Sequence, residues 1–457
     1  MGENKLTKKY GLITAIAMVV GIVIGSGVFF KAQTILEKTR GDVPMGVLAW
    51  IIGGAIMVVC ALAFATMATT YEKVNGIVDY AEATVGSRYA YLTGWFIATI
   101  YYPSMTSVLA WLSARYTLVF INCVFPGFVE NPVVGPECMA LTLLIMIASY
   151  AINALSPKLA GHFQVSTTII KLIPLLLMGV VGLIVGIANG TTVQNFTAPP
   201  TEATTSVTLL GAVVATAFAY DGWIIATSIN AELKNSKRNL PIALTIGATI
   251  IIVIYVLYYI GVAGGAPTAV LISEGATAAF RNVFGPVLGN ILNLFIAISC
   301  MGTLNGLMLA TARGMYAMAA RGKGPAPRTL GQIDPHTNVP ANSAIIGLLL
   351  TALWFFFFYG SQLAGWFGGF FGFDSSELPI VTIYAFYLPI FISFMCRGRN
   401  FGFVRRFLIP ALAILGSLFM IYAAFASHGV RVFAYLIVFA VIMLAGILFE
   451  VCRKKTA

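Results

Sequence analysis

Charged residues are scarce in this sequence: Asp, Glu, Lys and Arg make up 9% of its 457 residues, against about 25% in ordinary soluble proteins. Hydrophobic residues make up 59%, and the mean hydropathy is +0.91. So few charges cannot cover so apolar a chain in water, which excludes an ordinary soluble domain. Continuous apolar runs of about 20 residues recur along the chain, each long enough to cross a lipid bilayer as a helix. We therefore expect an all-α polytopic membrane protein rather than a β-barrel, whose strands would alternate in polarity.

Groups that carry chemistry are scarce as well. The three histidines form no cluster, and the sequence has no GxxxxGK[ST] phosphate-binding loop, which argues against an ATP-driven pump. We find no activated nucleophile, metal cluster or cofactor loop, so we expect no metal, no cofactor and no enzyme activity. The six cysteines have no paired spacing that would indicate a disulfide framework; they lie at positions 60, 123, 138, 300, 396 and 452.

Twelve apolar segments predict twelve transmembrane helices. The first segment is too long for a cleaved signal peptide and has no small-residue cleavage site. Residues 71–91 are too polar to span a bilayer and predict a short amphipathic helix along the inner interface. The predicted spans are residues 11–36, 46–70, 92–122, 137–155, 161–188, 207–232, 240–264, 285–318, 340–359, 377–396, 407–427 and 430–451.

The basic residues are distributed unevenly between the two sides of the membrane. If the N-terminus is cytoplasmic, the inner segments contain 19 Lys and Arg and the outer segments five. This positive-inside bias predicts that both termini are cytoplasmic. We therefore assign the net charge of +11 to the membrane surface and expect no nucleic-acid partner. The five outer residues are Lys31, Lys38, Arg40, Arg281 and Arg431.

Two spans contain residues that weaken a helix. The first contains GIVIGSGVFF (21–30), and each glycine in a helix costs about 1 kcal/mol relative to alanine. Its small residues fit either a packing face for a neighbouring helix or an unwound turn at Gly25 and Gly27. The sixth contains AFAYDGWII (217–225), whose Asp221 costs about 2.5–3.5 kcal/mol at a span centre on insertion scales. Asp221 either ends one half-helix and caps the next, or contacts a charged ligand group.

The two candidate breaks lie five spans apart, which predicts two inverted repeats. The first repeat would cover residues 1–188 and the second 207–396, with two C-terminal helices and a basic tail at 407–457. Unwound turns expose N–H groups that attract a carboxylate and carbonyls that attract an ammonium. A site that holds both ends of a zwitterion suits an α-amino acid, which is the small-molecule substrate that we expect.

Lys171 lies about ten residues into the fifth span, close to mid-membrane at about 1.5 Å of rise per residue. It is either part of a structural ion pair or a functional cation. Beside the broken first helix, its ammonium could stand where a coupling Na⁺ sits in other transporters and so make transport independent of sodium. We expect replacement of Lys171 with alanine to cripple transport and leave expression intact.

Four motifs resemble those of a known family and keep its order: GIVIGSGVF, AFAYDGW, ELKNSKRNLP and ISCMGTLNGLMLATAR. They are similar to the amino acid–polyamine–organocation superfamily, and within it to the L-type amino acid transporter-like branch. Bacterial serine/threonine and alanine/serine/cysteine exchangers are the most similar type. The resemblance covers nearly the whole chain and implies a LeuT-type fold of twelve helices and sodium-independent amino acid exchange.

The resemblance also implies which residues form the site. The substrate carboxylate would meet the backbone amides and hydroxyl around Ser26 and Gly27, and the ammonium would meet backbone carbonyls. Phe218 would close over the substrate as a gate. Lys171 would tie the unwound first helix to the eighth through the Gly25 carbonyl and Ser299. The implied substrate-binding residues are Val23, Gly25, Ser26, Gly27, Phe218, Ala219 and Asp221.

Three departures from the family pattern refine the expectation. Gly76-Ile77 stands where the family often has two glycines. Phe128 lies near the position of the cysteine that links animal members to a glycoprotein, so we expect no heavy-chain subunit. Ile224 and Ile225 are apolar where members with large substrates often carry polar or bulky groups, which indicates small neutral cargo.

Together these features predict an antiporter of small neutral L-amino acids such as Ala, Ser, Cys and Thr. We expect it in the plasma membrane, which in a bacterium is the inner membrane. Alternating access would use hinges at Gly25, Gly27 and Gly222. The alternatives are a proton-coupled amino acid symporter, or an exchanger of cationic amino acids or amines in which Asp221 faces the cation. A channel would need a continuous polar stripe, which we do not find.

Overall fold

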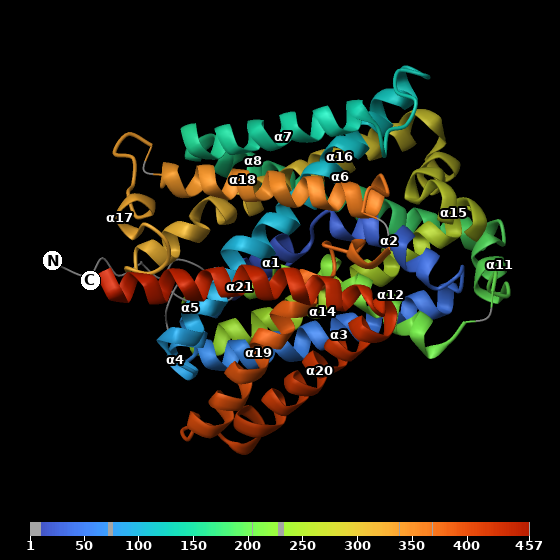
Figure 1. The fold of residues 1–457 in the computed structure, drawn as a ribbon. Coiled ribbons are helices and arrows are strands. Elements are labelled where there is room, and N and C mark those ends of the chain that lie inside the picture. Colours follow the sequence, from blue (N-terminus) through green and yellow to red (C-terminus); the bar gives the residue numbers. More distant parts are fainter. Residues whose placement is uncertain are drawn as a thin grey trace. The chain divides into compact units, whose positions relative to one another are not determined.

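The computed structural model describes residues 11–71, 76–202, 204–226, 233–337, 339–367 and 369–456. Over these residues the chain forms helices and no extended strand, as predicted (Figure 1). Nine of the described helices are long and apolar enough to cross a membrane, and a helix pair bent by 87° makes a tenth. Two shorter apolar helices, Leu12–Gly21 and Ser206–Tyr220, are the first parts of predicted spans one and six. Ten of the twelve predicted spans are thus matched by helices or a bent helix pair long and apolar enough to cross a membrane, and the first parts of the other two are helical.

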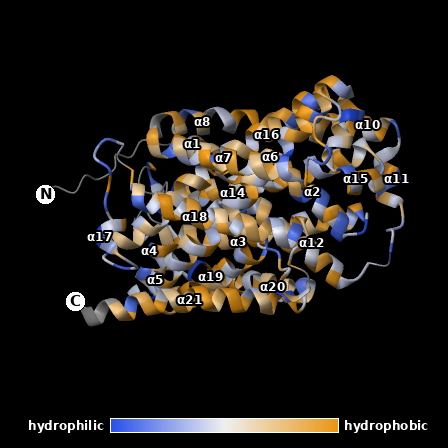
Figure 2. Ribbon diagram, turned by 45° about the horizontal axis from the view of Figure 1, so that its top comes forward, coloured by the Kyte–Doolittle hydropathy of each residue, from blue (hydrophilic) through white to orange (hydrophobic). Residues whose placement is uncertain are grey.

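Hydrophobic residues recur along most of the length of the long helices. Figure 2 shows this in orange for α3 (Val43–Ala68), α20 (Ile409–His428) and α21 (Arg431–Thr456). Helices that are apolar all round belong in lipid, because the lipid-facing side must be as apolar as the packed side. The fold is therefore that of a polytopic membrane protein.

The described chain divides into two compact units, each built from three separate segments. The first unit comprises the described residues of Met1–Thr93, Pro199–Tyr259 and Val381–Ser427. Besides α3 and most of α20, it contains α1 (Leu12–Val23), α2 (Gly27–Lys38), α4 (Ile77–Thr84), α12 (Ser206–Tyr220), α13 (Trp223–Ala226), and most of α14 (Ser236–Gly265) and α19 (Leu378–Arg397).

The second unit comprises Gly94–Ala198, Ile260–Ile380 and the described residues of His428–Ala457. α5 (Ser87–Phe96) leads into it from the first unit. Besides α21, it contains α6 (Tyr102–Val124), α7 (Pro136–Leu155), α8 (Pro157–Ile170), α9 (Leu172–Leu177), α10 (Leu183–Ala188), α11 (Thr191–Thr197), α15 (Thr268–Glu274), α16 (Ala276–Ala319), α17 (Pro327–Leu330) and α18 (Ala341–Phe358).

Local sequence sets several of the helix boundaries. Asp42 caps α3, and its side chain accepts a hydrogen bond of 2.8 Å from the Met45 amide. Thr205 and Thr208 form a capping box at the start of α12. α4 forms within the polar stretch 71–91, so the predicted helix there is confirmed over Ile77–Thr84, while its position at the membrane interface stays a prediction.

Three expectations need correction. The eighth span begins at Ala276, nine residues before the predicted start. Gly285, which has a φ of 77° and is followed by Pro286, bends the helix rather than starting it. The segment expected to be the loop after span five contains α11, the shorter arm of the pair bent by 87°. Lys31 does not belong to an outer loop: it lies inside α2 and its side chain is 1% exposed. Removing it from the outer set makes the positive-inside asymmetry larger.

Candidate functional site

The first predicted break is present. α1 ends at Val23 and α2 begins at Gly27, and Ile24 adopts an extended conformation with φ −65° and ψ 105°. Ser26 is fully buried, and its hydroxyl has no hydrogen-bond partner within the described part of the chain. The small residues of GIVIGSGVFF therefore do unwind the helix, and they leave an unsatisfied hydroxyl at the turn.

The second predicted break is present as well. α12 ends at Tyr220, Asp221 is extended with ψ 159°, and α13 begins at Trp223. Between them, Gly222 has φ +98°, in the left-handed region where a side chain is strained. Asp221 thus ends the first half of the span, while its contact with a substrate stays a prediction. The remainder of the predicted span, residues 227–232, lies outside the described residues.

The two breaks lie against one another within the first unit. A Cβ atom added to Gly27 would lie 2.8 Å from the Cα of Ala219 and 3.1 Å from the carbonyl oxygen of Phe218. Only glycine allows so close an approach of two backbones. The first residue of α2 is therefore packed directly on the last turn of α12. Gly27 therefore also packs against a neighbouring helix, which was the other interpretation of the small residues.

Tyr255, from α14, connects the two broken helices. Its hydroxyl lies 3.2 Å from the carbonyl oxygen of Val23 and 3.0 Å from that of Ala219, and its single proton is shared between these two acceptors. These carbonyls belong to the last turns of α1 and α12, where helical carbonyls lack partners within the helix. One fully buried hydroxyl therefore holds both helix ends at the breaks.

Aromatic rings support Tyr255 from the sides. The ring of Trp50 lies 5.4 Å from that of Tyr255 in an edge-to-face arrangement, and the ring of Tyr220 lies 5.2 Å from it. The Tyr220 hydroxyl donates a hydrogen bond of 2.9 Å to the Trp50 carbonyl oxygen. Rings locked in this way fix the hydroxyl position, so the turn geometry is built into the packing of α3, α12 and α14.

This arrangement can hold a zwitterion. The N-terminus of α2 offers backbone N–H groups that suit a carboxylate, beside the buried hydroxyl of Ser26. The C-terminal carbonyls of α1 and α12 suit an ammonium, and each carbonyl oxygen has a second lone pair beyond the one used by Tyr255. The described residues contain no group of three or more His, Cys, Asp and Glu side chains placed to hold a metal ion.

Of the predicted site residues, Lys171 and Ser299 belong to the second unit. Lys171 is 4% exposed and lies at the boundary between α8 and α9. Ser299 is fully buried, and its hydroxyl has no hydrogen-bond partner among the described residues, so it is not bonded to Lys171 in this conformation. The predicted tie from Lys171 to Gly25 and Ser299 stays a prediction.

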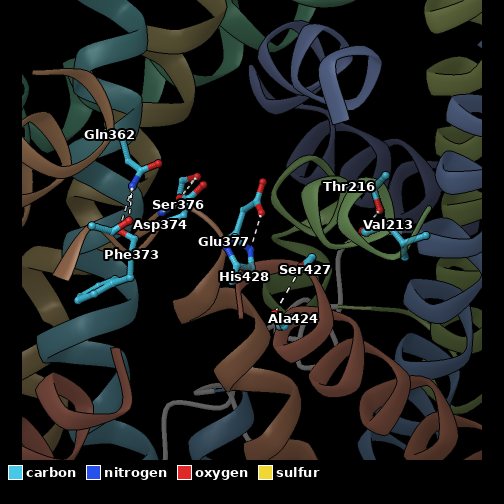
Figure 3. Close-up of polar contacts among 11 residues, drawn as sticks. Val213, Thr216, Gln362, Phe373, Asp374, Ser376, Glu377, Ala424, Ser427 and His428 are labelled. Atoms are coloured by element: carbon cyan, nitrogen blue, oxygen red, sulfur yellow. Dashed lines mark hydrogen bonds and ion pairs between the residues drawn. The ribbon is translucent and has the colours of Figure 1, made fainter. Parts of the chain in front are cut away.

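The second unit contains an acid–imidazole pair that no sequence motif indicates. The carboxylate of Glu377, just before α19, lies 3.1 Å from Nε2 of His428, the last residue of α20 (Figure 3). The Glu377 side chain is 0% exposed and that of His428 11% exposed. The two residues are 51 positions apart in the chain, so no local motif indicates the contact.

An all-helical membrane protein with two helices broken side by side, and a turn suited to a small zwitterion, has the construction of a secondary transporter. The chain matches the amino acid permease family over residues 10–448 and belongs to that family. It is therefore a transporter and not an enzyme.

Several relatives resemble the chain over most of its length. It is 30% identical to the serine/threonine exchanger SteT of Bacillus subtilis, over 92% of this chain and 91% of that protein. It is 27% identical to the human cystine/glutamate transporter, over 74% of this chain and 67% of that protein. The crystal structure of MhsT in complex with L-phenylalanine superposes with a TM-score of 0.61 at 15% identity, covering 93% of this chain and all of that one. At this identity the superposition shows the fold alone, which is the predicted LeuT type.

Proposed function

We propose that this transporter exchanges small neutral L-amino acids, with Ala, Ser, Cys and Thr as the preferred substrates, independently of sodium. The observation that carries the proposal is the pair of breaks joined by Tyr255 and Gly27. The breaks offer backbone amides to the carboxylate and backbone carbonyls to the ammonium of an α-amino acid. Asp221 is the one charged side chain within the two turns. The similarity to a protein named as a serine/threonine exchanger supports exchange as the mode of transport.

The predicted substrate residues keep their proposed roles. Ser26 and Gly27 bind the carboxylate, and Val23, Phe218, Ala219 and Asp221 surround the ammonium, with Gly25 completing the first turn. Ile224 is 7% exposed, so the wall after the second break is apolar and suits a small uncharged side chain. Phe218, which is 8% exposed, closes the site.

Sodium independence rests on Lys171. A buried ammonium in the membrane is costly and marks a functional position by default. We propose that it supplies the positive charge that Na⁺ supplies in sodium-coupled members of the fold. The two inverted repeats 1–188 and 207–396, the plasma-membrane location, the cytoplasmic termini and the independence from a heavy-chain subunit belong to the same proposal.

Uptake into proteoliposomes tests this function. Purified protein is reconstituted in sodium-free buffer, with and without unlabelled alanine inside, and labelled alanine is added outside. We expect uptake only with internal alanine, inhibition by external Ser, Cys and Thr, and indifference to Arg and Lys. Accumulation into empty liposomes would overturn exchange, and competition by Arg or Lys would overturn the neutral substrate class.

A proton-coupled symporter is the second candidate, and the Glu377–His428 pair favours it as a buried group that can accept a proton. The same liposomes distinguish the two functions. A symporter accumulates alanine in empty liposomes when the pH outside is lower than inside, and loses this on His428→Gln. An exchanger gives no accumulation under that gradient.

A further inference from the structure

Lys31 is a buried basic residue that has no role in the proposed transport cycle. It lies inside α2, and its side chain is 1% exposed. An ammonium withdrawn from water inside a membrane protein must be compensated by its surroundings. A buried charge inside a membrane-spanning segment therefore marks a candidate functional position.

Lys31 faces the second break. It follows Gly27 by four residues on α2, so both residues lie on the same side of that helix. Gly27 is the residue packed on Phe218 and Ala219. Side chains on a helix lean toward its N-terminus, which directs the Lys31 side chain back over the same neighbours.

Two aromatic rings lie close to the ammonium. The Nζ atom of Lys31 lies 5.1 Å from the ring centroid of Phe30 and 5.4 Å from that of Phe218. The two rings are themselves in edge-to-face contact, with centroids 6.3 Å apart and planes at 76°. An ammonium within about 6 Å of a ring centroid is attracted by the negative ring face, and this attraction is strongest where water is excluded. The position of the Phe218 ring is therefore coupled to the charge on Lys31.

We propose that Lys31 is a positioning residue for the Phe218 gate: its ammonium holds the ring in the orientation seen here through a cation–π contact. The proposal rests on the proposed function, in which Phe218 closes over the substrate. Lys31 acts through the ring and does not touch the substrate.

A series of fluorinated phenylalanines at position 218 tests the contact with little change in shape. Each fluorine weakens the negative face of the ring and hence its attraction for a cation. We expect the KM for external alanine to rise stepwise with fluorination, by about tenfold for the trifluorinated ring, while kcat changes little. A KM that is independent of fluorination would overturn the proposal.

The same series in a Lys31→Met protein is the control. Methionine keeps the length of the side chain and removes the charge, so we expect the dependence on fluorination to disappear there. A dependence that persists without Lys31 would overturn the proposal, because the ring would then act on another cation, such as the substrate ammonium.

The Lys31→Arg protein and a melting curve of each variant are the controls for a folding defect. Arginine keeps the charge and binds ring faces well, so we expect it to restore the wild-type KM and the fluorine dependence. If Lys31→Met does not fold, the fluorine series is compared between the wild-type and Lys31→Arg proteins. A KM that is independent of fluorination in both proteins overturns the proposal. Absence of exchange in the wild-type protein would instead refute the proposed function before any variant is measured.

Discussion

The two helix breaks are made in different ways. In the first span, three residues separate α1 from α2: Ile24, Gly25 and Ser26. Gly27, at the start of α2, has no side chain, and the backbone of Phe218 and Ala219 occupies that place. In the sixth span, only Asp221 and Gly222 separate α12 from α13, and the glycine supplies a φ of +98°.

The difference separates two uses of glycine that look the same in a sequence. Gly27 is needed because a second backbone occupies the place of its side chain. Gly222 is needed because of its own backbone conformation. Tyr255 then joins the products of both breaks by bonding to one carbonyl from each. Variants that remove one of these features at a time test whether the two breaks work as a single site.

Gly27→Ala should have the largest effect. Its new methyl group would lie 2.8 Å from the Cα of Ala219, and backbone cannot move aside as a flexible side chain can. We expect kcat/KM for alanine exchange to fall about 30-fold, equivalent to about 2 kcal/mol, as overpacking costs about 1–3 kcal/mol. Gly211→Ala on α12 is the control, because its methyl group would lie 3.3 Å from the side chain of Ser427. Wild-type exchange by Gly27→Ala would show that the breaks need not touch.

Gly222→Ala should come next. A side chain in the left-handed region costs about 1–3 kcal/mol, and we expect about a tenfold loss of exchange as the turn relaxes. Gly190→Ala is matched, with φ +81° and open space around the added methyl group. Both variants should melt at a lower temperature, but only Gly222→Ala should transport more slowly per folded molecule. Equal transport by the two variants would contradict a role of the second turn in transport.

Tyr255→Phe should have a smaller effect that falls on both breaks at once. It keeps the ring contacts with Trp50 and Tyr220 and removes the hydrogen bonds to Val23 and Ala219. A lost hydrogen bond to a buried carbonyl costs about 1 kcal/mol or more, so we expect KM to rise about fivefold. In Tyr259→Phe, on the same helix, the altered hydroxyl bonds to neither break, and KM should stay unchanged. An unchanged KM in Tyr255→Phe would show that the clamp is dispensable.

Asp221→Asn should have the smallest effect. Asparagine ends and caps helices about as well as aspartate, so a backbone role predicts a change in KM of less than about twofold. A direct contact between the carboxylate and a substrate cation predicts a much larger loss. Measuring alanine exchange together with competition by Arg and Lys distinguishes these roles, and a tenfold loss would favour the cationic exchanger.

The spans and both breaks could be predicted from the sequence because their signals are local. A bilayer requires long apolar runs, and glycine pairs or a lone aspartate inside such a run have few explanations. The described helices begin and end within a few residues of the predictions, except where Gly285 bends a helix instead of starting it. The site residues around Gly27 and Phe218 followed from the same motifs and from family resemblance.

Other features could not be read from the sequence. A tyrosine within the apolar seventh span looks like any core aromatic, and nothing local says that its hydroxyl reaches two carbonyls 36 and 232 positions away. Lys31, near the end of an apolar run, reads as a loop charge, although packing against Phe30 and Phe218 buries it. The Glu377–His428 pair depends on two helix ends meeting.

The sequence by itself determined that this is a membrane protein, where its helices lie and which residues of two of them weaken the helix. These properties follow from composition and from the intrinsic conformational preferences of glycine and aspartate. Only the tertiary structure decided which groups meet at the unwound turns, because hydrogen bonds, ring contacts and backbone approach join residues that are distant in the chain. Local sequence therefore sets the two helix breaks, and tertiary packing brings them together into one site.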